Sequence, residues 1–125
     1  MPDGKSGGGV TKMNSTIFPE PVLRLPEADI PINGVTAYLS QAENHQIIFM
    51  VFAEDTDLPE HAHEGQWGIV LEGEIELVIN GINYLYRKGD QYFIPKGVKH
   101  SGKIFAGYAD ITYFDQKDRY GCKTL

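Results

Sequence analysis

The chain has 125 residues, of which 42% are hydrophobic and 22% are charged, the composition of one globular domain with a hydrophobic core. Its formal net charge of −6 disfavours a nucleic acid or an anionic membrane as partner, because both attract clustered Lys and Arg side chains. No apolar run is long enough to span a membrane, no signal pattern is found at the N-terminus, and the single cysteine excludes an internal disulfide, so we expect a cytoplasmic protein.

The N-terminal part of the chain contains few residues that favour regular structure. Residues 1–14 are rich in glycine and small polar residues, which is typical of a disordered tail, so we expect one folded domain over residues 15–125. The next stretch, FPEPVLRLPEADIP (18–31), contains too many prolines for a helix and predicts an extended arm with short edge strands. Such an arm would either exchange with a second copy of the chain or cover an edge of its own sheet.

The middle of the chain predicts short strands joined by turns. The stretch GVTAYLSQAENHQIIFMVFAE (34–54) predicts two strands around a polar QAEN turn, where we expect His45 to be a solvated loop residue. The stretch GEIELVING (73–81) alternates between acidic and apolar residues, as a strand with one buried face does. Its last two residues, Asn80-Gly81, favour a tight hairpin turn, because both accept a positive φ.

The strands that follow complete an all-β pattern. INYLYR (82–87) predicts the return strand of the hairpin, and KGDQYFIPKGVKH (88–100) predicts a turn, a short strand and a second tight turn. GYADITYFDQ (107–116) predicts the last strand. Many antiparallel strands with hairpin turns, and no helix of useful length, predict a β-sandwich or jelly roll.

Three of the four histidines lie in two glycine-containing segments. His61 and His63 are two residues apart, so on one strand both side chains would point to the same side and could bind one atom. Gln66 has the opposite parity on an unbroken strand, but a bulge at Gly65 would restore it. Together with His100 from a distant strand, three imidazoles and an amide oxygen are enough to bind a divalent first-row metal. Because strands also place two polar residues on one face by chance, the interpretation depends on the second segment.

Both segments resemble the conserved motifs of the cupin family. HAHEGQWGIVLEG (61–73) is similar to the first cupin motif, and GDQYFIPKGVKH (89–100) is similar to the second. The resemblance implies a double-stranded β-helix, or jelly-roll barrel, that holds a metal in its interior. It also implies that His61 and His63 are the paired ligands of the first motif and that His100 is the ligand of the second.

The fourth expected ligand departs from the usual pattern of the family. The first motif commonly has a glutamate where this chain has Gln66, although some small cupins use glutamine there. One residue fewer separates His63 from Gln66 than in those relatives, and Glu64 is the competing carboxylate, although as the neighbour of His63 it should point away. The resemblance therefore implies that a divalent transition metal (Zn, Ni, Mn or Fe) is held by His61, His63, Gln66 and His100, with a small-molecule ligand in the barrel.

A neutral set of ligands leaves the +2 charge of such a metal uncompensated. The centre would favour anionic ligands, such as the carboxylate or enolate of a small substrate, and would lack the anionic ligand that stabilises an oxidised iron. We therefore expect isomerase or lyase chemistry of the Lewis-acid type, with Asp110 and Tyr113 on the last strand as candidate catalytic residues. The parity of that strand is open at this point, so Tyr108 and Thr112 are alternatives, as is Tyr92 on the preceding short strand near His100.

Two other functions fit the same residues. Three histidines around iron would suit a dioxygenase, and a closed pocket without an exchangeable water position would suit a non-catalytic ligand-binding protein. Single-domain cupins with a glutamine ligand include enzymes that linearise unsaturated uronates from pectin breakdown and enzymes that isomerise small keto acids. The stretch YFDQKDRYG (113–121) keeps an arginine of the first group, Arg119, but lacks its usual proline. Since small cupins tend to dimerise, we also expect a homodimer.

Overall fold

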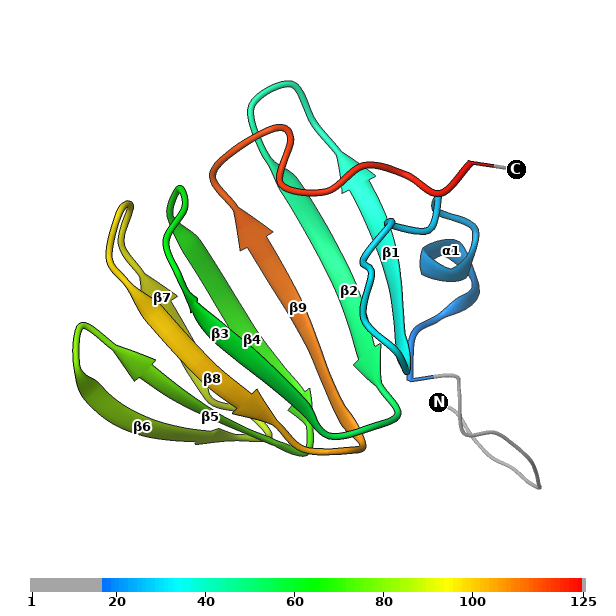
Figure 1. Cartoon of the computed structure of the whole chain (residues 1–125). Coiled ribbons are helices and arrows are strands. Elements are labelled where there is room, and N and C mark those ends of the chain that lie inside the picture. Colours follow the sequence, from blue (N-terminus) through cyan, green and yellow to red (C-terminus); the bar gives the residue numbers. More distant parts are fainter. Residues whose placement is uncertain (1–16, 125) are drawn as a thin grey trace.

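Two antiparallel β-sheets face each other in the computed structural model, which describes residues 17–124 (Figure 1). In chain order the strands are β1 (Val35–Gln41), β2 (Gln46–Phe52), β3 (Thr56–His61), β4 (Gln66–Glu72), β5 (Glu74–Ile79), β6 (Ile82–Arg87), β7 (Gln91–Ile94), β8 (His100–Ile104) and β9 (Tyr108–Phe114). The larger sheet has the order β1-β2-β9-β4-β7, and the smaller sheet has the order β3-β8-β5-β6. The tail predicted for residues 1–14 lies outside the described residues.

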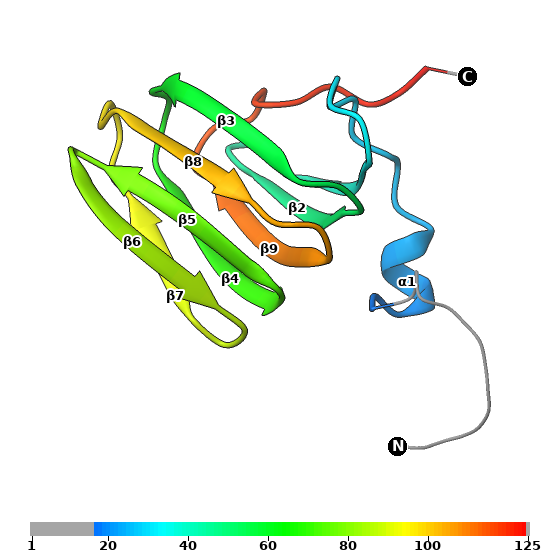
Figure 2. The ribbon, with the colours of Figure 1, turned by 60° about the horizontal axis from the view of Figure 1, so that its bottom comes forward.

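Strands that are distant in the sequence pair with each other in both sheets. The last strand, β9, lies between β2 and β4, and β8 lies between β3 and β5. Figure 2 shows the smaller sheet lying over the larger one, with the interior between them. This arrangement confirms the predicted all-β jelly roll.

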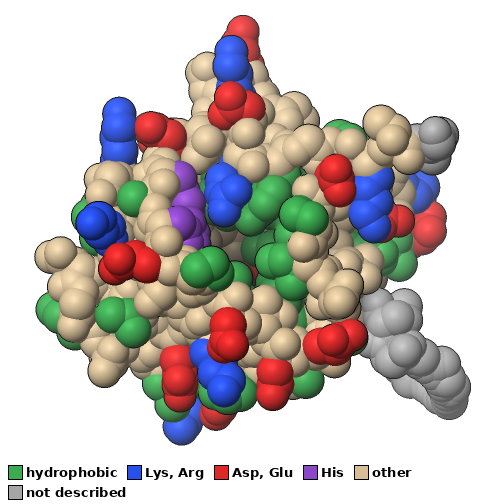
Figure 3. Space-filling model, viewed as in Figure 1, with side chains coloured by type: hydrophobic (Ala, Val, Ile, Leu, Met, Phe, Trp, Pro, Cys, Tyr) green, Lys and Arg blue, Asp and Glu red, His purple; other side chains and the backbone are tan. Residues whose placement is uncertain are grey.

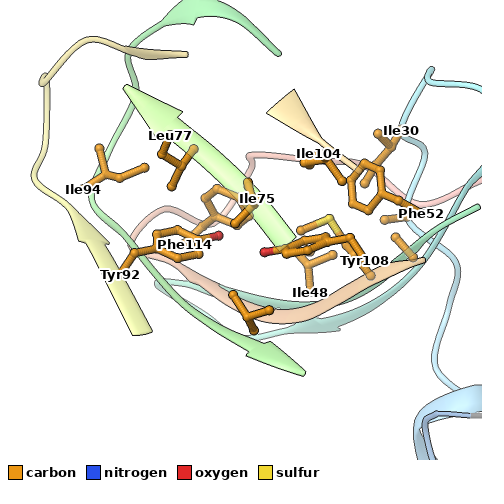
Figure 4. Packing of buried hydrophobic residues seen from close by; sticks show 14 of the residues in the cluster. Ile30, Ile48, Phe52, Ile75, Leu77, Tyr92, Ile94, Ile104, Tyr108 and Phe114 are labelled. Carbon is orange, nitrogen blue, oxygen red and sulfur yellow. The ribbon is translucent and has the colours of Figure 1, made fainter. Parts of the chain in front are cut away.

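The alternating sequence of β5 determines which of its faces is buried. Ile75, Leu77 and Ile79 are buried, and Figure 4 shows the first two pointing into the space between the sheets. Burying one such side chain contributes about 1.5–3 kcal/mol, so a shift of register by one residue would be costly. The turn after β5 has a φ of 50° at Asn80 and 80° at Gly81, which confirms the hairpin predicted there.

The segment before β1 differs from the extended arm that the prolines predict. It contains one helical turn, α1 (Glu20–Leu23), with Pro19 as its N-cap and Pro21 in its first turn. Proline is tolerated there because the first N–H groups of a helix have no partner within the helix. The prediction of extended structure throughout residues 18–31 is therefore wrong at this turn. Among the described residues no helix is long and apolar enough to cross a membrane.

The chain beyond β9 runs back across the ends of β2 and β1 (Figure 1). Gln46, which is fully buried, holds it from both sides: its Nε2 donates to the carbonyl oxygen of Tyr120 at 2.8 Å, and its Oε1 accepts from the Tyr120 N–H at 3.1 Å. The Asp29 N–H donates to the carbonyl oxygen of Gly121 at 2.8 Å. These bonds fix the position of the C-terminal segment, residues 115–124, relative to the larger sheet.

Candidate metal centre

Three histidines come together between the two sheets at one end of the barrel. Their potential ligand atoms all lie within 4.8 Å of one another. His61, the last residue of β3, is the direct cross-strand partner of His100, the first residue of β8, and their ring centroids are 4.2 Å apart. The ring of His63 lies 5.1 Å from that of His61 and 4.8 Å from that of His100. The structure thus brings together the three histidines that the sequence predicts as ligands.

The route by which His63 reaches this site differs from the predicted one. Strand β3 ends at His61, so His63 lies in the loop before β4 rather than on the same strand. The loop is held by two backbone bonds, from the Gly97 N–H to the His63 carbonyl oxygen at 2.9 Å and from the Asp115 N–H to the Gly65 carbonyl oxygen at 2.8 Å. The irregular pairing lies earlier, between Leu58 and His61, and not at Gly65, where the sequence predicts a bulge.

Each of the three imidazoles has one nitrogen bound to the backbone. The Nδ1 atoms of His61, His63 and His100 lie within 3.0 Å of the carbonyl oxygens of Pro59, Glu64 and Val98, respectively. A carbonyl oxygen can only accept, so each Nδ1 must carry the proton, and each Nε2 keeps a free lone pair. The Nε2 atoms of His63 and His100 are buried and have no partner in the structure. This is the tautomer that a histidine needs in order to bind a metal through Nε2.

The electrostatic environment keeps two of these histidines neutral. Burial lowers the pKa of His63 to about 4, and the positive charge of Arg119 acts in the same direction. Burial also lowers the pKa of His100, again with a contribution from neighbouring positive charge. At neutral pH both lone pairs are therefore available, because neither imidazole holds a second proton.

A cavity of about 510 Å³ opens beside the histidines. Figure 3 shows histidine side chains at one edge of a hollow whose other edge is hydrophobic. The buried polar side-chain atoms that lack a partner among the described residues belong to His63, His100, Asp110, Thr112, Gln116 and Arg119. All of these residues except Thr112 line the cavity. Unpaired polar atoms are costly in a protein interior, so their concentration around one cavity indicates a ligand site.

Gln66 is the first residue of β4 and also lines the cavity. Its Nε2 donates to the hydroxyl oxygen of Tyr92 at 3.3 Å, and its side chain is partly buried. An amide has one donor end and one acceptor end, so this bond leaves the acceptor, Oε1, for another partner. The position of Gln66 is consistent with its predicted role as a ligand, which stays a prediction.

Asp110 lies deeper in the barrel, on the inner face of β9. Its Oδ2 accepts from the Tyr108 hydroxyl at 2.6 Å and from the Tyr92 hydroxyl at 3.4 Å. Burial raises the pKa of Asp110 to about 7, although the hydrogen bonds from both tyrosines oppose the shift. The candidate base predicted from the sequence thus lines the cavity and titrates near neutral pH.

Tyr113, the other predicted catalytic residue, lies on the opposite face of β9. Its ring stacks on that of His45 at a centroid distance of 4.8 Å, and it does not line the cavity. This contact also changes the expectation for His45, which is half-buried rather than a solvated loop residue. Trp67 faces the same outer side, where its Nε1 donates to Gln91 at 3.1 Å, so it does not line the mouth of the pocket. The geometry therefore gives no support to a catalytic role for Tyr113.

Arg119, which the sequence identifies only as an arginine shared with one group of cupins, lines the cavity. Its guanidinium carbon lies 4.4 Å from the ring centroid of Tyr120 and 5.6 Å from that of Phe114. It makes no ion pair with a described residue, and its Nε is buried without a partner. Its placement depends on the long-range bonds of Gln46 to the C-terminal segment, which no local sequence pattern reveals.

These residues fit a divalent transition metal. Three neutral imidazoles and an amide oxygen form a borderline donor set, suited to Zn, Ni, Mn or Fe, and two of the Nε2 atoms are orphaned in a buried position. The backbone carbonyls that hold each Nδ1 are the outer partners that orient metal-binding histidines.

Comparisons with known proteins agree with this fold. Residues 48–107 match a family model described as a cupin domain. An RmlC-like cupin from Shewanella frigidimarina superimposes with a TM-score of 0.65 at 23% identity, over 75% of this chain and 86% of the other. KdgF from a Halomonas species gives 0.62 at 17% identity, over 73% and 87%.

Larger proteins share the same barrel. Oxalate decarboxylase from Bacillus subtilis gives a TM-score of 0.62 at 19% identity, over 80% of this chain and 30% of that one. No sequence among the curated proteins matches the chain. At these identities the similar structures establish the fold, while the chemistry has to be argued from the site itself.

Proposed function

We propose that this chain, which belongs to the cupin family, is a metal-dependent enzyme that carries out isomerase or lyase chemistry of the Lewis-acid type on a small anionic substrate. The observation that carries the proposal is the pairing of three histidines that present free Nε2 atoms with an unpaired guanidinium on the same cavity. The first group suits a metal, and the second suits a carboxylate.

The metal would be held by His61, His63 and His100, with Gln66 as the fourth ligand. A divalent metal bound there would act as a Lewis acid on a substrate carbonyl or enolate. Because these four side chains are neutral, the ligands themselves add no negative charge that would repel an anion from the metal. The same neutrality disfavours an oxidised iron, which is why we rank oxygen chemistry below isomerisation or elimination.

Arg119 would bind the carboxylate of the substrate. A guanidinium offers several N–H donors in a fixed plane, which matches the two oxygens of a carboxylate. The rings of Tyr120 and Phe114 hold this group, while no acidic side chain among the described residues neutralises it. A substrate with a carboxylate at Arg119 and a carbonyl near the histidines would therefore be held at two points.

Asp110 would move the proton. Its carboxyl group lies on the cavity wall and its pKa is about 7, so at neutral pH it can accept a proton from a substrate carbon and return it to another position. Apolar side chains, including Ile75, Leu77 and Ile94, line the same cavity and would limit the access of water to the reacting centre. The volume of the cavity limits the substrate to a small molecule.

Metal content is the first test of the proposal. We expect untagged wild-type protein to contain about one equivalent of Zn, Ni or Mn by elemental analysis, and His61→Ala to lose it. His45→Ala is the matched control, because this histidine stacks on Tyr113 outside the cavity and should leave the metal content unchanged. Absence of metal from the wild type even after reconstitution, or stoichiometric iron together with oxygen uptake, would contradict the proposed chemistry.

The anionic substrate is tested separately with pyruvate as a probe. We expect the zinc-loaded protein to bind pyruvate in a calorimetric titration, and Arg119→Gln to weaken the binding by about 10-fold or more. Arg24→Gln is the control, because Arg24 is exposed at the C-terminal end of α1 and pairs with Glu20. Equal affinities of the wild type and Arg119→Gln would remove Arg119 from the site.

A further inference from the structure

A chain of hydrogen bonds connects the candidate ligand Gln66 to the buried carboxylate of Asp110. Gln66 Nε2 contacts the Tyr92 hydroxyl oxygen at 3.3 Å, and that hydroxyl contacts Asp110 Oδ2 at 3.4 Å. Tyr108 contacts the same carboxylate oxygen at 2.6 Å but makes no bond to Gln66. Figure 4 shows the two tyrosine rings approaching from opposite sides, with their hydroxyl oxygens facing each other.

The chemistry of these groups fixes the direction of each bond. An ionised carboxylate can only accept, so the single hydroxyl proton of Tyr92 must point toward Asp110. A phenol keeps its single proton at neutral pH, so this proton is available to the carboxylate. The lone pairs of the Tyr92 oxygen therefore face Gln66 and can be satisfied only by the NH₂ end of its amide. The amide is thereby oriented with Oε1 away from Tyr92.

The backbone beside Gln66 is shaped to admit the Tyr92 ring. Gly68 lies opposite Tyr92 in the pairing of β4 with β7. A Cβ atom at Gly68 would lie 2.4 Å from Cζ of Tyr92 and 2.5 Å from its hydroxyl oxygen, which is too close for any real contact. The phenol can therefore reach both Gln66 and Asp110 only because residue 68 is glycine.

We propose that Tyr92 is a positioning residue that orients the amide of Gln66 so that Oε1 is presented to the metal, with Asp110 setting the direction of the Tyr92 hydroxyl. The inference rests on the proposed metal site. An amide needs such a device because its two ends differ, whereas the two oxygens of a glutamate are equivalent. Tyr92 thus compensates for the presence of glutamine where the first cupin motif commonly has glutamate.

Two matched Tyr→Phe variants separate positioning from general support of the carboxylate. We expect Tyr92→Phe to weaken the affinity for Zn²⁺ by about 10-fold at pH 8, measured by competition with a chromophoric chelator, because outer partners of metal ligands typically contribute 10- to 100-fold. Tyr108→Phe removes the shorter bond to the same Asp110 oxygen and should change the affinity by less than about 2-fold. Equal losses in the two variants, or no loss in Tyr92→Phe, would overturn the inference.

A double-mutant cycle tests whether Tyr92 acts through Gln66. In the background of Gln66→Ala, Tyr92→Phe should have no further effect on Zn²⁺ affinity, whereas a purely structural role would give the same loss as in the wild type. The visible spectrum of the Co²⁺-loaded protein should be shared by the wild type and Tyr108→Phe and altered in Tyr92→Phe, because an oxygen ligand is lost. A spectrum common to all three proteins would contradict the assignment.

The wild type itself offers a measurement if Tyr92→Phe does not fold. The side-chain amide protons of Gln66, identified by their absence from Gln66→Ala, should exchange slowly with solvent in the Zn²⁺-loaded protein because one of them is bonded to Tyr92. Free exchange would overturn the inference. If the wild type binds no Zn²⁺ at all, the proposed metal site fails, whereas unchanged binding in Tyr92→Phe removes the positioning role alone.

Discussion

The polar groups at the two ends of the cavity differ in how far their hydrogen-bonding capacity is satisfied within the protein. At the mouth, His61, His63 and His100 each use one nitrogen to hold the backbone and leave the other free. On the floor, Tyr108 and Asp110 bind mainly to each other. The polar atoms at the mouth are thus free to bind a ligand from outside the protein, whereas most of those on the floor are already hydrogen-bonded to each other.

The difference shows how binding capacity and stability are divided in a small barrel. Free lone pairs are costly when buried, so they are confined to a place where a ligand can satisfy them. Groups that bond to each other can be packed deeply, provided that the network is almost closed. Among the described residues around this carboxylate, only Asp110 Oδ1 and Thr112 Oγ1 lack a partner, and of these two residues only Asp110 lines the cavity. Changes at the mouth should therefore affect ligands first, and changes on the floor should affect the fold first.

The largest effect on metal affinity is expected when one of the three histidines at the mouth is removed. His100→Ala removes a ligand that pairs across the sheet with His61, so Zn²⁺ affinity should fall by more than ~100-fold. Circular dichroism of the metal-free variant should still show the β-sheet spectrum, since the core on the floor is intact. Retention of stoichiometric zinc in a titration would mean that the histidines are not the ligands.

The next effect concerns the floor and depends on pH. The folded-state pKa of Asp110, about 7, lies above that of a free aspartate, so the stability it contributes is present below about pH 4 and is lost as the pH rises through 7. Relative to the wild type, Asp110→Asn should therefore gain a few kcal/mol in free energy of unfolding between pH 4 and pH 8. Urea titrations across this range measure the difference.

Asp57→Asn serves as the control for that measurement, because Asp57 is exposed on β3. The stability of this variant should run parallel to that of the wild type across the range. A parallel curve for Asp110→Asn as well would show that the carboxylate is not titrating inside the barrel.

A smaller effect on stability and on metal affinity is expected from Gly68, which lies between the floor and the mouth, beside Tyr92. Gly68→Ala places a Cβ against the Tyr92 ring, and overpacking of this kind costs about 1–3 kcal/mol. We expect a lower thermal midpoint together with weaker Zn²⁺ binding, because the displaced phenol no longer reaches Gln66.

The control for this variant is a glycine at which an added Cβ meets no neighbour. Gly81→Ala is not suitable, since its φ of 80° adds backbone strain. Gly121→Ala is better, because nothing lies within 4 Å of the added atom.

The smallest effect should come from the one histidine outside the cavity site. His45→Ala removes the stacking contact with Tyr113, a contribution of about 0.5–1.5 kcal/mol, and should leave metal content and pyruvate binding unchanged. Thermal unfolding and elemental analysis measure both quantities. Loss of metal in this variant would contradict the division between the cavity and the outer face of the sheet.

Local patterns of the sequence predict the fold well, because alternation and turn residues act over short distances. The strands of 35–52 and 74–87 and the Asn80-Gly81 hairpin are confirmed. The helical turn α1 is missed because the prolines occupy positions where a helix tolerates them. The homodimer expected from the sequence stays a prediction, which light scattering would check.

The site is less predictable, since it depends on contacts between distant segments. The histidines are predicted from their spacing, but the loop that directs His63 is fixed by Gly97 and Asp115 from elsewhere in the chain. The inward face of β9, which separates Asp110 from Tyr113, follows from pairing with β2 and β4. Arg119 reaches the cavity through the crossing of the C-terminal segment, which depends on the distant Gln46, so the partial resemblance of residues 113–121 to one group of cupins does not predict this position.

Strand β3 lies at the edge of the smaller sheet, and its pairing with β8 is irregular just before His61. Edge strands with a broken ladder open more easily than central ones. A metal ion bound by His61, His100 and Gln66 would link β3 to β8 and to the larger sheet. It would therefore stabilise the irregular pairing at this edge. Occupancy of the site would then be seen in the backbone as well, as slower amide exchange along β3 and greater resistance of that strand to proteases.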